Sequence, residues 1–447
     1  MQVDPTLSIL DSHSKPAHKT ELDLFSVPET QTSIISHHTV YHHPLSTLTD
    51  QGPVEFFISG SGEEYIDPND ITAHITCRIT RPDGTALKEK ANVAPSNFML
   101  HNLWSQIDLS LNDTLITNSS STYAHTAYVN TILTASRQAE KTALVLQGWA
   151  KDKGKDPSSM DLNLNKGHAT RVDWAAKSRD IDMKGKLQLD LCKQKNLLPH
   201  QVALRLKLVR NPDAFCLGVG EGPDANVKYK IQLVNVALEV RKCKINPNTL
   251  KAHTELSLKH TFKYPIKRTV TKVFTEPGHS MSINKENIFL GQLPHRVIIG
   301  LMNTNAYHGH YNLNPFFFHH YNIDYIALHL NGRTIPSRPL RPNFAHNNYA
   351  RSYHQTMEAY NAIDSNITNT ISYNEFGSGY SLFAFDLTPD QSAHQPQHLN
   401  LIKNGTLRLE IHFKEALPHT ISILIQGEFD NLIEIDRFRN VLLDYSH

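Results

Sequence analysis

Short runs in which apolar and polar residues alternate dominate the chain from Val54 onward, separated by Pro, Gly, Asn and Asp. Side chains of a β-strand point alternately to its two faces, so the three leucines of Leu204-Arg-Leu-Lys-Leu208 share one face. One face of each strand is then buried and the other meets solvent, as in an antiparallel sandwich. The sequence predicts strands at Ile71–Ile79, Ile107–Leu111, Lys186–Leu191, Ala203–Val209 and Lys228–Val240.

The second half of the chain repeats parts of the first half in the same order. Each match alone is weak, because alternating leucine strands recur by chance, but three ordered matches predict a tandem duplication. A helix is expected after the first match in each half, near Thr122–Gln138 and near Asn347–Ala362. The matched pairs are Leu109–Ile116 with Leu328–Ile335, Leu189–Leu191 with Phe385–Leu387, and Leu204–Leu208 with Leu407–Ile411.

Alternation and duplication together predict an all-β fold. We expect a double jelly roll, made of two tandem eight-stranded antiparallel β-sandwiches with loop insertions and short helices. Folding two sheets onto each other also limits the number of exposed sheet edges. Residues 1–50 are predicted to be an N-terminal arm, 51–250 the first jelly roll, and 251–447 the second jelly roll with a C-terminal extension.

The near-equal numbers of basic and acidic residues argue against some classes of function. Lys and Arg number 44 against 43 Asp and Glu, which argues against a dedicated binder of nucleic acid or anionic membranes. No membrane span is expected, because even the uncharged stretch Val297–Ile323 is studded with Asn and His. The N-terminus does not show the pattern of a secretory signal. Cys77, Cys192, Cys216 and Cys243 are predicted to be reduced, buried thiols of an intracellular product.

The sequence contains only incomplete matches to catalytic and cofactor-binding motifs. No enzymatic activity and no cofactor are therefore predicted. Gly148–Asp156 imitates a phosphate-binding loop with the wrong spacing and is predicted to be a solvated loop. Gly218–Gly222 is predicted to be a turn. His308-Gly-His310 would share one strand face, but no acidic residue follows before Asp324, so no metal site is predicted.

Two other classes of protein stay open. A two-barrel, cupin-like metalloenzyme would need a chelating triad and bound metal. A carbohydrate-binding sandwich would need a groove lined with aromatic residues, for which Tyr311 and Phe316–Phe318 are candidates. An apolar core or interface is the alternative interpretation of that run.

Groups of basic residues, and the histidines taken together, allow further predictions. Lys151–Lys155, Lys263–Lys272 and the group Arg333, Arg338 and Arg341 are predicted to be solvated faces, with contact to a packaged genome as the alternative. Histidine titrates near pH 6.5, so one hypothesis is that protonation of the 27 histidines loosens an assembly of this chain in mild acid through repulsion of like charges. The alternative is that these are ordinary surface and core imidazoles whose hydrogen bonds are satisfied.

Six unrelated segments follow one another in order from about Glu21 to Val441. They are Glu21–Ile34, Pro53–Asp67, Asn287–Pro294, Asn314–Phe318, Phe429–Arg437 and Arg439–Val441. Together they resemble the major capsid protein of Polinton (Maverick) elements and the related adintoviruses. This resemblance implies a double jelly-roll fold and a homotrimeric, pseudo-hexameric capsomer of an icosahedral virus-like particle.

The resemblance also implies partners and a location. The chain would associate with itself, first as a homotrimer and then as a lattice of capsomers. A penton or minor capsid protein is an expected partner, and contact with packaged DNA stays unassigned. The protein would be found in the virion, after synthesis in the host cytoplasm and an assembly step that could be nuclear.

The same segments give the candidate site residues, each a structural motif or a subunit contact. Phe56-Phe57-Ile58 is continuously apolar, which predicts burial on both faces or at a subunit contact. Glycines and prolines mark turns or an extended connection. The candidates are Phe56, Phe57, Gly60, Gly62, Phe289, Gly291, Pro294, Phe316, Phe318 and Pro339.

Overall fold

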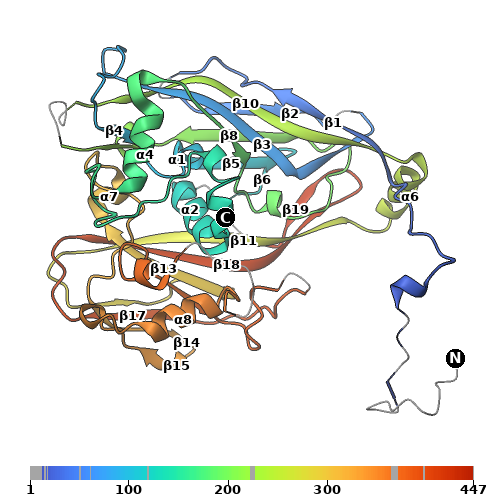
Figure 1. Ribbon diagram of the computed structural model, residues 1–447. Helices are drawn as coiled ribbons and strands as arrows, with labels where there is room; N and C mark the ends of the chain where they lie inside the picture. Colours follow the sequence, from blue (N-terminus) through green and yellow to red (C-terminus); the bar gives the residue numbers. More distant parts are fainter. Residues whose placement is uncertain are drawn as a thin grey trace.

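The computed structural model describes residues 13–14, 17, 19–49, 52–60, 62–117, 120–221, 227–363, 371–395 and 398–445. Figure 1 shows the first half of the chain, blue to green, stacked on the second half, yellow to red. One continuous hydrophobic core runs through both halves. Residues 1–12 of the predicted arm lie outside the described residues.

The strands of the first half are β1 (Ile34–His42), β2 (Val54–Ile58), β3 (Glu64–Thr80), β4 (Val93–Pro95), β5 (Trp104–Leu111), β6 (Thr114–Leu115), β7 (Ile181–Lys186), β8 (Leu204–Arg210), β9 (Leu217–Val219) and β10 (Lys230–Ile245). They form two four-stranded sheets, ordered β1-β10-β3-β7 and β2-β8-β5-β6, and a short pair, β4-β9. Alternate residues of β8 are buried, as the leucine pattern predicts. The two four-stranded sheets form the first sandwich.

The strands of the second half are β11 (Phe262–Glu276), β12 (Ser282–Lys285), β13 (Arg296–Asn303), β14 (Ile323–Leu330), β15 (Arg333–Leu340), β16 (Leu382–Asp386), β17 (Leu407–Phe413), β18 (Ile421–Ile435) and β19 (Val441–Leu443). One sheet has the order β11-β18-β13-β16, with β19 paired to β18, and the other has the order β12-β17-β14-β15. Within the described residues, β19 is thus one strand more than the predicted eight. These two sheets form the second sandwich.

Equivalent hairpins occur in the two halves, at two of the three matched pairs of segments. In the first half Leu111 pairs with Thr114, and β8 pairs Leu204 with Leu111. The second half repeats this register, since Leu330 pairs with Arg333 and with Leu407. Both two-residue turns, Asn112-Asp113 and Asn331-Gly332, have positive φ at both residues, which matches the twist of the flanking strands.

Three local predictions are wrong. Residues 187–190 leave the sheet after β7, and a 3-10 turn follows at Leu191–Lys193, so Lys186–Leu191 is not a strand. Its leucines are still buried, which explains the misleading alternation. The match of Leu189–Leu191 to Phe385–Leu387 therefore pairs a loop with strand β16.

Gly218 and Val219 lie in β9, paired with β4, rather than in a turn; Gly222 lies outside the described residues. The other four predicted strands lie within or close to β3, β5, β8 and β10.

The α-helices are α1 (Met99–Asn102), α2 (Tyr123–Thr134), α3 (Arg137–Glu140), α4 (Lys166–Ala175), α5 (Asp213–Cys216), α6 (Pro247–Ser257), α7 (Thr304–His308), α8 (Ala350–Glu358) and α9 (Tyr373–Phe376). The predicted helix Thr122–Gln138 is divided, because Ala135 is extended and the Ser136 side chain caps α3. The helix predicted near Asn347–Ala362 is confirmed as α8. Helix α2 is buried on nearly every side and lies between the two sandwiches (Figure 1).

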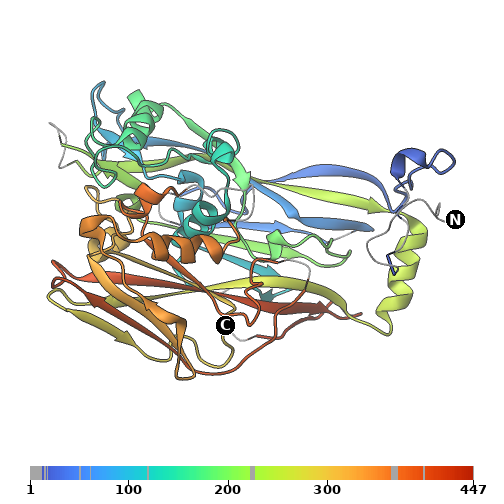
Figure 2. The ribbon, with the colours of Figure 1, turned by 60° about the horizontal axis from the view of Figure 1, so that its bottom comes forward.

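A ribbon made of β1, β3 and β10 extends beyond the first sandwich and ends at α6 (Figure 2). Tyr65, Cys243 and Ile245 form a small separate core there. Strand β1 lies within the predicted arm, so this part of the arm is an edge strand of the first sandwich. The proposed boundary at residue 250 falls inside α6. We call this end of the molecule the arm end.

Candidate functional site: the junction of the sandwiches and the arm end

Aromatic side chains from both halves meet around α2. Tyr128 stacks on Phe316 at a ring-centroid distance of 4.3 Å and on Trp149 at 5.2 Å. Phe215 meets Phe316 edge to face at 5.7 Å, and Phe318, fully buried, lies 6.4 Å from the Tyr128 ring. The predicted contact residues Phe316 and Phe318 therefore pack inside one chain, where they hold the two sandwiches together.

A buried ion pair lies beside this aromatic cluster. Arg171 Nη2 donates to Asp152 Oδ1 at 2.6 Å, and the two side chains are 3% and 2% exposed. The side-chain amides of Asn165 and Asn314 donate to Asp152 Oδ1 and Oδ2, each at 2.9 Å. The Tyr380 hydroxyl donates to the Asp152 carbonyl oxygen at 2.6 Å. Because Asn314 and Tyr380 belong to the second half, this network also joins the sandwiches.

The segment Gly148–Asp156 is not the solvated loop that the sequence predicts, because its first part is buried at the junction. Lys151 Nζ lies 3.0 Å from Glu375 Oε2 and 4.7 Å from the centre of the Tyr380 ring. Burial lowers the pKa of Lys151, although Glu375 opposes that shift. Burial acts to raise the pKa of Glu375, but Lys151 and Ser372 outweigh it and the pKa is lowered. Trp149 is the residue of this segment that could have indicated burial, because a large apolar side chain is unusual in a solvated loop.

The apolar run in β2 is buried on one face only. Phe56 and Ile58 are fully buried, whereas Phe57 points outward and is 45% exposed. The prediction that this strand is buried on both faces within the chain is therefore wrong at Phe57. The other prediction, that Phe57 lies at a subunit contact, stays a prediction. A Cβ at Gly60 would collide with the backbone of Val202, and Gly62 has a φ of +90°, so both glycines are needed by the turn.

The candidates of the second half are mostly structural. Phe289 is buried and meets Phe429 edge to face at 5.4 Å. Gly291 has a φ of +79° in the turn that leads through the buried Pro294 to β13. Pro339 lies in the edge strand β15, the position in a sheet that tolerates a missing amide donor.

Neither histidines nor cysteines form a reactive centre in the described part of the chain. His308 ends α7 and Gly309 has a φ of +95°, so His308 and His310 do not share a strand face. No group of three or more His, Cys, Asp or Glu side chains among the described residues is placed to hold a metal ion. All four cysteines are buried and form no disulfide, and burial raises the pKa of Cys77 and of Cys192 to about 12.

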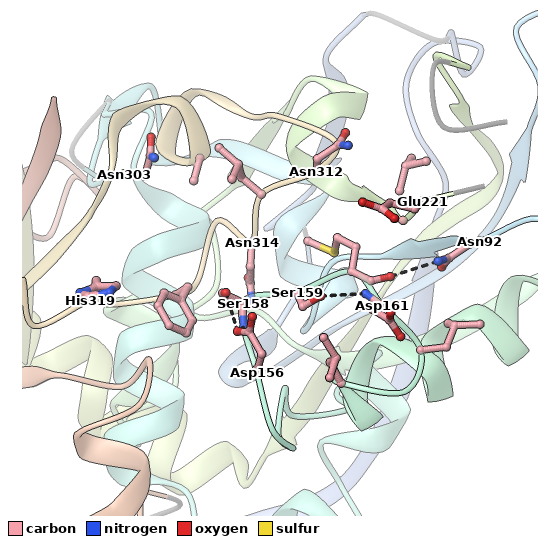
Figure 3. Close-up of a pocket in the computed structure, with 18 of the residues that line it drawn as sticks. Asn92, Asp156, Ser158, Ser159, Asp161, Glu221, Asn303, Asn312, Asn314 and His319 are labelled. Carbon is pink, nitrogen blue, oxygen red and sulfur yellow. Dashed lines mark hydrogen bonds between the residues drawn. The ribbon is translucent and has the colours of Figure 1, made fainter. Parts of the chain in front are cut away.

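A cleft of about 710 Å³ opens between loops of the two halves (Figure 3). Two of the carboxylates that line it stabilise the loops: Asp156 accepts hydrogen bonds from Ser158, and Asp161 accepts one from the backbone of Asn163. Glu221 also lines the cleft. Phe316 and Phe318 are buried, so the predicted run does not line a carbohydrate groove as a whole, although His319 and Tyr321 add aromatic rings to this cleft. Phe317 is the member of its run that lines the cleft, and the Tyr311 hydroxyl donates to the Tyr229 carbonyl oxygen.

Buried histidines change the expected response to acid. Burial lowers the pKa of His101, His125, His168 and His320 to about 4. These four side chains therefore stay neutral in the folded chain in mild acid, and counting all 27 histidines overestimates its charge. In the unfolded chain they titrate near pH 6.5. Between these values the unfolded state binds more protons, so stability falls as pH falls from about 6.5 toward 4.

We expect the thermal midpoint to drop on acidification through this range, with each such histidine contributing up to about 1.4 kcal/mol per pH unit. His125 is packed among aromatic rings, so His125→Phe should flatten the pH dependence. His354→Gln, at an exposed position, should not change it. Calorimetry at pH 7.5, 6.5 and 5.5 measures the slopes, and a flat wild-type profile would contradict the assignment.

Exposed apolar side chains gather on the second sandwich near Gly291. Gly405 N donates to Gly291 O and Leu293 N donates to Lys403 O, so the two segments run side by side. Leu290 is 79% exposed and Leu401 is 75% exposed, with Leu399 and Ile402 in the same stretch. A cluster of exposed apolar side chains is characteristic of an interaction surface.

Comparisons with known proteins show which folds this architecture resembles. No family model matches the sequence. An uncharacterized protein of Caenorhabditis elegans is 24% identical over 429 residues, covering 94% of this chain and 99% of that protein. A chain of the Sputnik virophage cryo-EM structure matches with a TM-score of 0.65 at 10% identity, covering 98% of this chain and 94% of that one. The fold is a double jelly roll.

Two further double jelly rolls resemble the chain. The PBCV-1 virus capsid gives a TM-score of 0.58 at 11% identity, covering 95% of this chain and 100% of that one. The Faustovirus major capsid protein gives 0.57 at 7% identity, covering 93% of each chain. The predicted all-β fold class is thus confirmed. Among the described residues of this double jelly roll, no helix has the length and apolar character that a membrane span requires.

Proposed function

We propose that this double jelly roll is the major capsid protein of a Polinton (Maverick) element or a related adintovirus, with a structural role and no catalysis. The observation that carries the proposal is the presence of two sandwiches with the same hairpin register in one chain. Three such chains around a threefold axis present six similar sandwiches. A capsomer with this outline tiles a curved lattice without six identical chains.

The comparisons and the surface support self-assembly. Two of the similar structures are named as a virus capsid and a major capsid protein. The chain exposes apolar side chains near Gly291 and at Phe57, as expected of a protein whose contacts are completed by further copies. Among the ten candidate residues, Phe57 is the large apolar side chain that remains exposed, so we assign the subunit contact to it.

The remaining partners and the location follow from the same proposal. Capsomers would join into an icosahedral lattice, with a penton or minor capsid protein at its vertices. The basic strand β11, which contains Lys263 and Lys272, is a candidate for contact with packaged DNA. The protein would be part of the virion, after synthesis in the host cytoplasm.

Negative-stain electron microscopy of the purified full-length chain tests the proposal. We expect shells, or separate capsomers with a pseudo-hexagonal outline, at neutral pH. Raising the protein concentration should increase the fraction of shells. Uniform particles of single-chain size at all concentrations would contradict a capsid role.

A further inference from the structure

The segment from Thr20 to Glu29, which we call the docking segment, exposes apolar side chains that its own chain does not cover. Phe25 is 98% exposed and Val27 is 88% exposed, and Leu22 and Leu24 are also exposed. Figure 2 shows this part of the chain, in blue, clear of both sandwiches and at the same end of the molecule as α6. Glu21, Asp23 and Glu29 make the segment acidic.

Contacts at the start of β1 direct the docking segment away from its own sandwiches. Asn246, at the start of α6, donates from its side chain to Thr32 O and from its backbone to Ser33 O. Gln31 Oε1 accepts from the Ile34 backbone, which caps the entry into the strand. The chain is therefore held at the tip of the ribbon, and the docking segment projects beyond it.

A groove of about 460 Å³ lies at the arm end of the molecule, where the two halves meet. Phe57 of the first half and Phe438 of the second half line it, together with Arg205, Arg439 and Asp113. Phe438 is 69% exposed. Asn112 Nδ2 donates to Arg439 O at 3.0 Å, which fixes the two sides of the groove relative to each other.

The groove and the docking segment are complementary in apolar surface and in charge. Arg205 and Arg439, with Arg437 beside the Phe438 ring at 4.5 Å, outnumber the one acidic lining residue, Asp113. Nη1 of Arg439 is buried and has no hydrogen-bond partner. The docking segment offers carboxylates that alternate with Leu22 and Leu24, so charges and apolar groups can be matched together.

We infer that the docking segment of one copy binds the Phe57–Phe438 groove of a second copy of this chain. This inference rests on the proposed self-assembly and names the contact between neighbouring copies. Apolar side chains of the segment would cover the two phenylalanines, and its carboxylates would face the arginines at the rim. The segment then acts as a strap that links copies.

Site-directed cross-linking tests the inference in the full-length chain. The natural cysteines are buried, so single surface cysteines can be introduced selectively. Preparations of Ser26→Cys, in the docking segment, and Ala203→Cys, in the lining of the groove, are mixed and mildly oxidised, so that both phenylalanines of the contact are kept. We expect a covalent two-chain product at least tenfold more abundant in the mixture than in either preparation alone. A chain carrying both substitutions that links mainly to itself when diluted would overturn the inference, as would the absence of any cross-link.

A charge exchange provides a second readout. Asp23→Lys and Arg205→Glu should each lower the cross-linking yield at least threefold, and combining them should restore it. Lys177→Glu, an exposed residue whose charge partner is Glu89, is the control and should leave the yield unchanged. Failure of the combination to restore cross-linking would contradict the charge matching.

Sedimentation of the same samples separates this inference from the proposed function. Capsomers that form without the cross-link would overturn the docking inference alone. Chains that stay single and do not cross-link would overturn both.

Discussion

Replacing Asp152 by asparagine is expected to lower the free energy of unfolding by about 3–5 kcal/mol. Arg171 would keep its positive charge at a 3% exposed position without the carboxylate that neutralises it. The amides of Asn165 and Asn314 would also face a donor in place of one of the two carboxylate oxygens. Urea unfolding followed by tryptophan fluorescence measures the change, since Trp149 lies in the same segment.

The matched control is the exposed pair Lys177–Glu89, with side chains 67% and 75% exposed. Glu89→Gln removes one charge of an ion pair there as well, but solvent screens both groups, so we expect a change below about 1 kcal/mol. If Asp152→Asn had as small an effect as Glu89→Gln, the network would not be what joins the sandwiches.

Replacing Phe316 by alanine is expected to cost about 3–5 kcal/mol, because it opens a cavity in the aromatic cluster around α2. Phe316 is 1% exposed and stacks on Tyr128, so neighbouring rings can refill the space only in part. The loss should appear as a lower midpoint in urea for the isolated chain, whether or not copies associate.

Phe57→Ala is the matched control, since it removes the same group from a half-exposed position. We expect less than about 1 kcal/mol of change in chain stability but weaker association between copies. The opposite outcome, with Phe57→Ala unfolding the chain and Phe316→Ala leaving it stable, would contradict the division into core and contact residues.

The sequence was sufficient to predict the two sandwiches because their signals are local. Burial with a period of two marks β3, β5 and β8, and turn residues with positive φ fix the hairpins at Asn112 and Asn331. The same signal failed for Lys186–Leu191, where the leucines are buried by packing after the strand has ended. Alternation of apolar and polar residues indicates which side chains are buried. It does not by itself show that the segment pairs with another strand in a sheet.

The junction could not be predicted, because its partners are far apart in the sequence. Nothing near Asp152 indicates that Asn314 and Tyr380 will surround it, and a Gly- and Lys-rich segment ordinarily meets solvent. Phe316 and Phe318 are predicted from the sequence as core or contact residues, but an apolar run has the same pattern whether it faces another domain or another chain. Contacts that depend on tertiary packing had to come from the structure.

Sedimentation equilibrium of the full-length chain at neutral pH tests the central claim most directly. If each chain supplies two sandwiches to a closed ring of three, the dominant species should have three times the 50.6 kDa mass of the chain, before or together with larger shells. A single 50.6 kDa species that persists as the concentration rises would contradict the account.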